Sequence, residues 1–167
     1  TGRLMTNAAR AHSCGIELSG QWMPAGGLTL AGSYGFTNAT FRSYTSGGVS
    51  YRGKHLPYAP AHTVFASAEW QLPLHIGDTS VSAGANMRGA GPIYWDDANT
   101  VRQKFYATLG AHITIAGTDE RWSLRLWGEN ITDTHYDTFY FVSVGKAFLQ
   151  QGKPWQAGVT LRYSIDY

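Results

Sequence analysis

Apolar and polar side chains alternate with a period of two along the last part of the chain. Six residues fall on one face of this segment: Ala157, Val159, Leu161, Tyr163, Ile165 and Tyr167. The opposite face carries Gly158, Thr160, Arg162, Ser164 and Asp166. Strict alternation over this length predicts a β-strand with one apolar and one polar face, ending on an aromatic residue.

Six earlier segments alternate in the same way, while helical periodicity is scarce. They span residues 13–22, 28–37, 64–71, 80–88, 105–115 and 122–129. In each segment the charged residues keep to the polar face. A Lys or Arg facing lipid at the bilayer midplane costs about 2–4 kcal/mol, so this segregation suits strands that cross a membrane. We therefore predict an all-β fold of about seven antiparallel strands.

Short and long connections alternate between these segments. The short ones lie at residues 24–27, 75–78 and 117–120, and the long ones at 43–60, 92–103 and 134–152. Outer-membrane barrels have short periplasmic turns and long extracellular loops, an asymmetry that a soluble sandwich does not need. The chain end then lies on the periplasmic side. Trp22, Trp70 and Trp122 fall beside short turns, where barrels carry an aromatic girdle.

Composition agrees with a transmembrane barrel without excluding a soluble β-sandwich. Charged residues make up only 14% of the 167 residues and aromatic residues another 14%. A net charge of +2 gives no support for a nucleic-acid partner. The single Cys14 excludes an internal disulfide, and no apolar run is long enough for a transmembrane helix. No signal peptide opens the chain.

Seven strands would leave a spanning sheet with two open edges. Within lipid every backbone N–H and C=O must be paired, so such a sheet must close. Bacterial single-chain barrels have an even number of strands, eight or more. We therefore expect the chain to be part of a larger barrel, with earlier strands missing from it.

Four sequence motifs point to a known family. Residues 53–63, Gly-Lys-His-Leu-Pro-Tyr-Ala-Pro-Ala-His-Thr, resemble a Gly-Lys-x-Leu-Pro-x-x-Pro-x-x-Thr loop. Residues 130–136 resemble an Asn-Leu-Thr-Asp-x-x-Tyr motif, and residues 152–155 a Gly-x-Pro-Arg motif with Trp155 in place of the Arg. Together with a hairpin over residues 15–39, these motifs resemble the C-terminal barrel of TonB-dependent outer-membrane receptors, in family order across nearly the whole chain.

The resemblance implies an architecture and a function. The family has an N-terminal plug domain, a TonB box and a barrel of about 22 strands. Residues 1–167 would be the C-terminal part of such a barrel in the bacterial outer membrane, without plug or earlier strands. The parent receptor would take up a scarce nutrient, most closely an iron–siderophore chelate, and would need no cofactor or catalysis. Its expected partners are membrane lipid and lipopolysaccharide, the barrel assembly machinery, the missing barrel and plug, and the inner-membrane TonB complex reached through the plug.

The resemblance also places the substrate in an outward-facing vestibule. Candidate loop residues there are Tyr51, Arg52, Lys54, His55, Tyr58, Tyr94, Trp95, Asp96, Asp97, Tyr136 and Tyr140. Cations and aromatic faces suit an anionic, aromatic iron chelate, although each residue could equally belong to the girdle or to solvated surface. The terminal Tyr163, Ile165 and Tyr167 resemble the signal by which the barrel assembly machinery recognises its substrates.

Three other kinds of site or fold leave weaker signals in the sequence. Six His residues show no metal-ligand spacing, so we expect no metal site. A barrel enzyme could use Asp133, His135 and Asp137, yet nothing marks a nearby hydroxyl as an activated nucleophile. A soluble β-sandwich binding module would bury the face carrying Leu161, Tyr163 and Ile165 against a second sheet.

Overall fold

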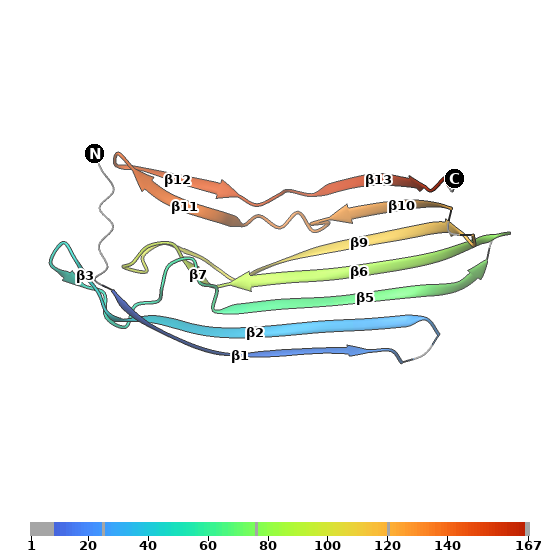
Figure 1. Cartoon of the computed structure of the whole chain (residues 1–167). Helices are drawn as coiled ribbons and strands as arrows, with labels where there is room; N and C mark the ends of the chain where they lie inside the picture. Colours follow the sequence, from blue (N-terminus) through green and yellow to red (C-terminus); the bar gives the residue numbers. More distant parts are fainter. Residues whose placement is uncertain (1–8, 25, 76, 120, 166–167) are drawn as a thin grey trace.

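The computed structural model is built on one antiparallel sheet of seven strands in the order β1-β2-β5-β6-β9-β10-β13 (Figure 1). It describes residues 9–24, 26–75, 77–119 and 121–165. The strands of this sheet are β1 Arg10–Trp22, β2 Leu28–Ser43, β5 His62–His75, β6 Thr79–Gly91, β9 Tyr106–Gly117, β10 Trp122–Glu129 and β13 Gln156–Tyr163. Each strand pairs antiparallel with the strand that precedes it in this order, so the predicted fold of seven antiparallel strands is confirmed.

The apolar face of the sheet is uncovered. Ile16 is 61% exposed at one edge strand, Ile113 50% in the middle, and Leu161 71% at the other edge. Tyr163 and Ile165 are equally open, and the described residues form no second sheet that packs on them. The burial expected for a soluble sandwich is therefore wrong, because the apolar side chains face outward as they do toward lipid.

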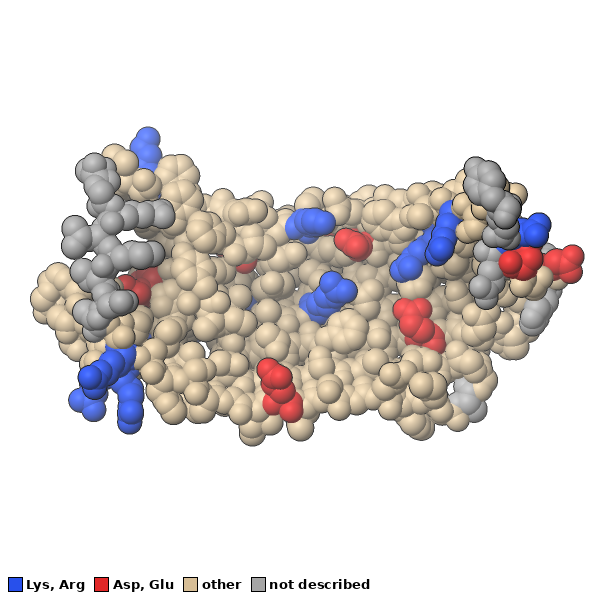
Figure 2. All heavy atoms as spheres, viewed as in Figure 1, with Lys and Arg blue, Asp and Glu red and all other residues tan. Residues whose placement is uncertain are grey.

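The opposite face carries the polar side chains. Figure 2 shows charged side chains of both signs spread over the middle of the face it presents. On this face the Nε2 of His112 on β9 lies 3.2 Å from a carboxylate oxygen of Glu69 on β5, which reaches it across β6. The strand between them carries Gly84 at the crossing point, and a Cβ there would collide with both side chains. The glycine is what allows the pair to form.

The short turns and their aromatic neighbours agree with the sequence. Trp22 and Trp70 are exposed near the end of the sheet where β1 turns into β2 and β5 into β6. The indole N–H of Trp70 donates to the Gly26 carbonyl over 3.1 Å, which ties it to the neighbouring turn. Trp122 pairs with Tyr163 at the same end. These rings occupy the positions expected of an interfacial girdle.

The last strand is shorter than its alternation predicts. β13 ends at Tyr163, which pairs with Trp122, the first residue of β10. Beyond that pair the neighbouring strand has already turned away, and only the Ser164 N–H still donates, to the Arg121 carbonyl over 2.8 Å. Ile165 therefore lies outside the strand, and Tyr167 lies outside the described residues.

Each long connection forms a small hairpin that the sequence did not predict. The first contains β3 Thr45–Ser46 and β4 Val49–Ser50, the second β7 Ile93–Tyr94 and β8 Arg102–Gln103, and the third β11 Asp137–Ser143 and β12 Lys146–Gln151. All three lie at the end of the sheet opposite the short turns (Figure 1). The described part of the chain contains no helix that is long and apolar enough to cross a membrane.

Candidate functional site

The segment before β5 is held against the extended end of β2. The Phe41 N–H donates to the Lys54 carbonyl over 2.9 Å, and the Gly53 N–H donates back to Phe41 over 2.9 Å. Further along, the Leu56 N–H donates to the Ala39 carbonyl over 3.0 Å. The Gly-Lys-x-Leu-Pro motif therefore continues the sheet beyond β5, which fixes the direction of the side chains that follow it.

Asn99, in the second hairpin, binds both backbone groups of His55. Its Oδ1 accepts from the His55 N–H over 2.7 Å, and its Nδ2 donates to the His55 carbonyl over 2.9 Å. The same Nδ2 lies 3.2 Å from the Asp96 carbonyl. The His55 ring stacks on Tyr94, with centroids 5.1 Å apart and planes 4° from parallel. One amide side chain thus joins the first long loop to the second.

Tyr58, in the segment before β5, contacts the second and the third hairpin. Its N–H donates to the Tyr94 carbonyl over 2.8 Å, and its hydroxyl donates to the Tyr140 carbonyl over 2.6 Å. Its ring lies 5.4 Å from the Trp95 ring and 5.5 Å from the Phe139 ring. Its φ of 65° is unusual for a bulky residue, and such strain persists only where the surroundings enforce it. Tyr58 is therefore the centre of an aromatic cluster at the mouth of the sheet.

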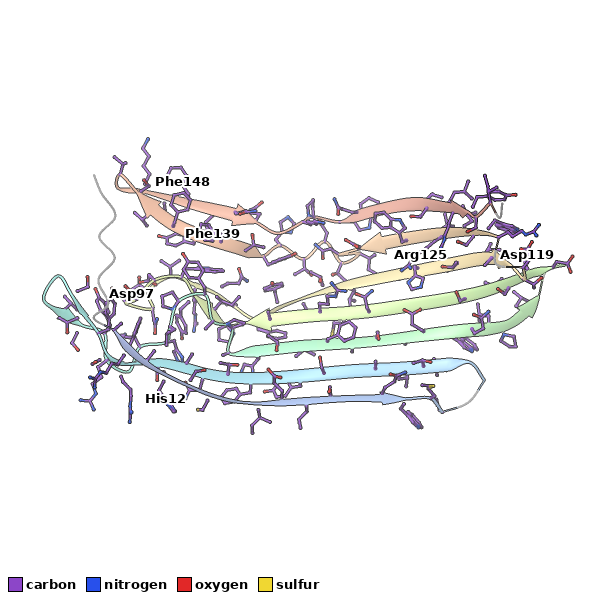
Figure 3. All side chains as sticks on the ribbon, viewed as in Figure 1. His12, Asp97, Asp119, Arg125, Phe139 and Phe148 are labelled. Carbon is purple, nitrogen blue, oxygen red and sulfur yellow. The ribbon has the colours of Figure 1, made fainter. Side chains whose placement is uncertain are left out.

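The third hairpin extends this cluster with more rings. Phe139 and Phe141 on β11 are followed by Phe148 on β12, with successive centroids 5.7 Å and 5.0 Å apart. Figure 3 shows Phe139 and Phe148 on the two facing strands of this hairpin. Its base is fixed by Gln103, whose Oε1 accepts from the Asp137 N–H over 2.9 Å. We call Tyr58, Trp95, Phe139, Phe141 and Phe148 the aromatic mouth.

The two adjacent acids differ in role. Asp96 accepts from the Thr100 hydroxyl over 2.7 Å and from the Val101 N–H over 2.8 Å, so its carboxylate organises its own loop. Burial alone would raise the pKa of Asp96, but these hydrogen bonds outweigh it and lower that pKa below its ordinary value. Asp97 is half-buried and makes no hydrogen bond to another described residue, which leaves its carboxylate available.

The remaining sequence candidates do not join the aromatic mouth. Tyr51 packs against Tyr44 at 5.5 Å, and Tyr44 packs on Phe41 at the end of β2. Arg52 and Lys54 are exposed beside that second cluster. The structure therefore brings Tyr58, Trp95 and the Tyr140 backbone together, holds His55 and Tyr94 as a pair beside them, and separates Tyr51, Arg52 and Lys54.

Below the mouth, the polar face of the sheet forms an open cavity of about 490 Å³. Tyr136 lies here, stacked on Tyr106 with centroids 4.1 Å apart. Charged groups from three elements line the same cavity: Arg88, Arg125, Glu129 and Lys153. The candidate Tyr136 thus belongs to the inner wall and not to the loop surface.

The Asn-Ile-Thr-Asp motif is a structural anchor. Asn130 is only 6% exposed, and its Nδ2 donates to the Thr134 and Lys153 carbonyls, both over 3.0 Å. The Asp133 carboxylate accepts from the Trp155 N–H over 3.0 Å. The structure shows no hydrogen bond between Asp133 and His135, two of the residues considered for a barrel enzyme. Among the described residues there is also no group of three or more His, Cys, Asp or Glu side chains that could hold a metal ion.

Several residues of the site carried no sequence signal that we recognised. Phe139 and Phe148 lie on a hairpin inside a segment read as a loop, although the run Phe-Tyr-Phe at 139–141 hints at a strand. Asn99 and Gln103 act through contacts with residues 44 and 34 positions away, which spacing does not reveal. The alternation places Arg88, Arg125 and Glu129 on the polar face. That they line one cavity depends on the register between the strands, which the sequence does not reveal.

Comparison with known proteins gives the family. Residues 1–131 match the family model described as TonB dependent receptor-like, beta-barrel. The chain belongs to this family of TonB-dependent receptors. Their barrels lie in the bacterial outer membrane, which confirms the predicted location and places the three hairpins on the extracellular side.

Individual members of the family match nearly the whole chain. The pesticin receptor of Yersinia pestis is 27% identical over 164 residues, which are 98% of this chain and 23% of that receptor. The crystal structure of the ferric yersiniabactin uptake receptor FyuA from Yersinia pestis superposes with a TM-score of 0.83 at 24% identity, covering 96% of this chain and 24% of that one. The siderophore receptor PiuA from Acinetobacter baumannii gives a TM-score of 0.71 at 17% identity, over 93% of this chain and 22% of that one. The chain thus spans about a quarter of the length of these relatives.

Proposed function

We propose that this chain forms part of the wall and mouth of a TonB-dependent receptor that takes up an iron chelate across the outer membrane. The observation that carries the proposal is the aromatic mouth, in which Tyr58, from the segment before β5, joins the second and third hairpins. The relatives support the substrate class, because their names include a ferric yersiniabactin uptake receptor and a siderophore receptor.

The mouth has the chemistry to hold the flat, aromatic part of a ligand. Tyr58, Phe139, Phe141 and Phe148 are between 42% and 47% exposed, so each offers part of a ring face to the outside. Rings with a free face stack on planar ligands and gain about 0.5–1.5 kcal/mol per pair beyond simple burial. The hydrogen bonds made by Tyr58 and Asn99 hold these rings in place before a ligand arrives.

The rest of the receptor is part of the same proposal. We infer that further strands close the barrel, because the edges of β1 and β13 are not paired with each other in the described sheet. A plug domain would then occupy the polar side and receive energy from the inner-membrane TonB complex. Tyr163, Ile165 and Tyr167 would serve the barrel assembly machinery, and the exposed side chains of Tyr163 and Ile165 are compatible with that role.

Iron-limited growth of cells whose only chelate receptor contains this chain tests the proposal. Ferric yersiniabactin and ferric preacinetobactin, the cargoes named for two structural relatives, are the first chelates to supply. We expect growth with at least one chelate and about a tenfold or greater loss of uptake for Tyr58→Ala, the usual cost of removing a central aromatic contact. Tyr51→Ala is the matched control, because Tyr51 lies in the separate cluster on β2.

Two results would contradict the proposal. Equal uptake by the Tyr58→Ala and wild-type receptors would show that the aromatic mouth does not bind the substrate. An equal loss in both tyrosine variants would show a general defect of the loops, and no uptake of any chelate by the wild-type receptor would exclude the substrate class.

A further inference from the structure

The backbone of His55 is held from two sides. On one side His55 forms an antiparallel bridge with Thr40 on β2. On the other side the amide of Asn99 accepts from the His55 N–H over 2.7 Å and donates to the His55 carbonyl over 2.9 Å. These contacts leave the backbone little freedom, so the direction of the His55 side chain is set before any ligand arrives.

The ring of His55 is fixed as well, but its nitrogens are open. The ring stacks on Tyr94 with centroids 5.1 Å apart and planes 4° from parallel. Within the described part of the chain, neither the ring nitrogens of His55 nor the Tyr94 hydroxyl forms a hydrogen bond, and both side chains are half-buried. By comparison, the Nδ1 of His62 lies 2.8 Å from the Tyr34 hydroxyl. His55 and Tyr94 are thus held in place while their polar atoms stay available for a ligand.

The pair borders the aromatic mouth. Tyr94 directly precedes Trp95, and the Tyr94 carbonyl accepts from the Tyr58 N–H over 2.8 Å. His55 lies three residues before Tyr58 in the same segment. The neighbouring Lys54 does not share this position, because successive side chains of a bridged, extended segment point to opposite sides. His55 and Tyr94 therefore bring hydrogen-bonding groups to the border of a surface that otherwise consists of rings.

We propose that His55 and Tyr94 form a polar subsite of the aromatic mouth and bind an ionised oxygen, a carboxylate or phenolate, next to the aromatic ring of the chelate. An imidazole N–H and a phenol O–H are both donors, and their hydrogen bonds to an ionised oxygen are stronger than those between neutral groups. The parallel stack places the two side chains next to each other. This inference rests on the proposed function and deepens it, because it assigns the flat part and the charged part of the chelate to different residues.

The test measures uptake of ferric yersiniabactin and ferric preacinetobactin by the complete receptor over a range of chelate concentrations. His55→Phe keeps a ring that stacks on Tyr94 but removes both nitrogens. We expect the concentration for half-maximal uptake to rise about tenfold, the usual effect of losing one hydrogen bond to a charged group, and the maximal rate to stay unchanged. Tyr94→Phe should raise the same concentration, and His135→Phe is the control, because His135 is exposed and lies outside the mouth.

Asp97→Asn separates an anionic ligand group from a cationic one. The Asp97 carboxylate lies in the same hairpin as Tyr94 (Figure 3). Removing its negative charge should leave the uptake of a chelate with an ionised oxygen unchanged or improve it, because like charges repel. A loss of uptake in Asp97→Asn together with unchanged uptake in His55→Phe would assign the subsite to a cation and overturn the proposal.

Other outcomes would also overturn the proposal. An unchanged half-maximal concentration in both His55→Phe and Tyr94→Phe would show that the pair only stiffens the loop, and an equal rise in His135→Phe would show a general effect. If His55→Phe speeds hydrogen exchange of residues 53–58, Tyr94→Phe decides the question, because it leaves both hydrogen bonds of Asn99 in place. Loss of uptake in Tyr58→Ala with normal uptake in His55→Phe and Tyr94→Phe would keep the proposed function and reject the subsite. No uptake by the wild-type receptor would reject both.

Discussion

At the scale of single residues, the mouth is organised by side chains that bind backbone groups of other loops. Asn99 and Tyr58 both have positive φ, 58° and 65°. Asn tolerates this conformation well, whereas Tyr does not, so the strain at Tyr58 must be offset by its two hydrogen bonds and two ring contacts. These two residues join the segment before β5 to the second and third hairpins.

Replacing Asn99 should loosen the first long loop. Asn99→Gly keeps the positive φ accessible but removes both hydrogen bonds to His55, and we expect hydrogen exchange of residues 53–58 to become about tenfold faster, since each bond contributes about 0.5–1.5 kcal/mol. Asn99→Ala should exchange faster still, because it adds the strain of a Cβ at positive φ. Identical exchange in wild type and both variants would show that Asn99 does not hold the loop.

Asp96 should make the second hairpin sensitive to acid. The pKa of Asp96 is lower in the folded protein than in the unfolded chain. The ionised carboxylate therefore stabilises the second hairpin fully above the ordinary carboxyl pKa of about 4. This stabilisation is lost as the pH falls through the lower pKa that Asp96 has in the folded protein. Protection factors for residues 95–101 should therefore stay constant down to about pH 4 and fall below it. The Asp96→Asn variant should show lower protection at neutral pH and no such fall. A wild-type profile that is flat below this pH would refute the prediction.

At the scale of the strands, alternation predicted the seven strands of the large sheet and their facing, but not the strands of the three small hairpins. It succeeded because lipid selects the outward positions and pairing selects the register, so that one-sided charge is visible in the sequence. Alternation did not predict where the strands end. β2 continues to Ser43, well beyond residue 37, because β1 pairs with it as far as Ser43 and the segment around Gly53 supplies hydrogen-bond partners on its other edge. β13 stops at Tyr163 because its neighbour β10 begins opposite that residue.

The loops were predictable in length but not in structure. The candidate residues Tyr58 and Trp95 do converge, yet Tyr51 and Tyr136 belong to other surroundings. Composition identified aromatic residues and charges in the long connections without revealing which of them meet. That choice depends on contacts such as Tyr58 with Tyr140, which join residues 82 positions apart.

The facing of β5 gives a matched pair of substitutions. Ala68 lies on the apolar face opposite Leu30, and the adjacent Ser67 lies on the polar face opposite Asn86. Ala68→Arg should destabilise the assembled barrel by about 2–4 kcal/mol and lower the heat-modifiable fraction in membranes, whereas Ser67→Arg should assemble nearly as well as wild type. Equal assembly of the two variants would contradict the assignment of faces.

The contact between Glu69 and His112 across β6 gives a second matched pair of substitutions. Gly84→Ala places a Cβ against the flexible ends of both side chains, which must move apart, and should cost about 0.2–1 kcal/mol in unfolding free energy through loss of the pair. Gly20→Ala is the control, because nothing lies within 4 Å of the added Cβ. The gel mobility of the folded barrel at increasing denaturant concentration measures the unfolding free energy of both variants. An equal change of this free energy in Gly84→Ala and Gly20→Ala would contradict the contact between Glu69 and His112 across Gly84.

At the scale of the whole molecule, the sheet has two surfaces and two open edges. One surface is apolar and uncovered, the other is polar and carries the cavity under the aromatic mouth. In a bilayer the unpaired backbone groups at the edges of β1 and β13 would each cost several kcal/mol, so the sheet is stable there only as part of a closed wall. The lipid-facing surface and the inward cavity both depend on this one placement of the sheet in the membrane.

The placement is tested most directly by spin labels along β5 in the complete receptor, reconstituted in lipid after Cys14 and any cysteine outside these 167 residues are replaced by Ser. Single cysteines at residues 64–71 carry the label, and collision with oxygen, which partitions into lipid, is compared with collision with a water-soluble nickel complex. Labels at Val64, Ala66, Ala68 and Trp70 should favour oxygen, and labels at Phe65, Ser67, Glu69 and Gln71 should not, giving a period of two. Uniform access of the nickel complex to all eight positions would show that β5 does not face lipid and would contradict the membrane-spanning wall.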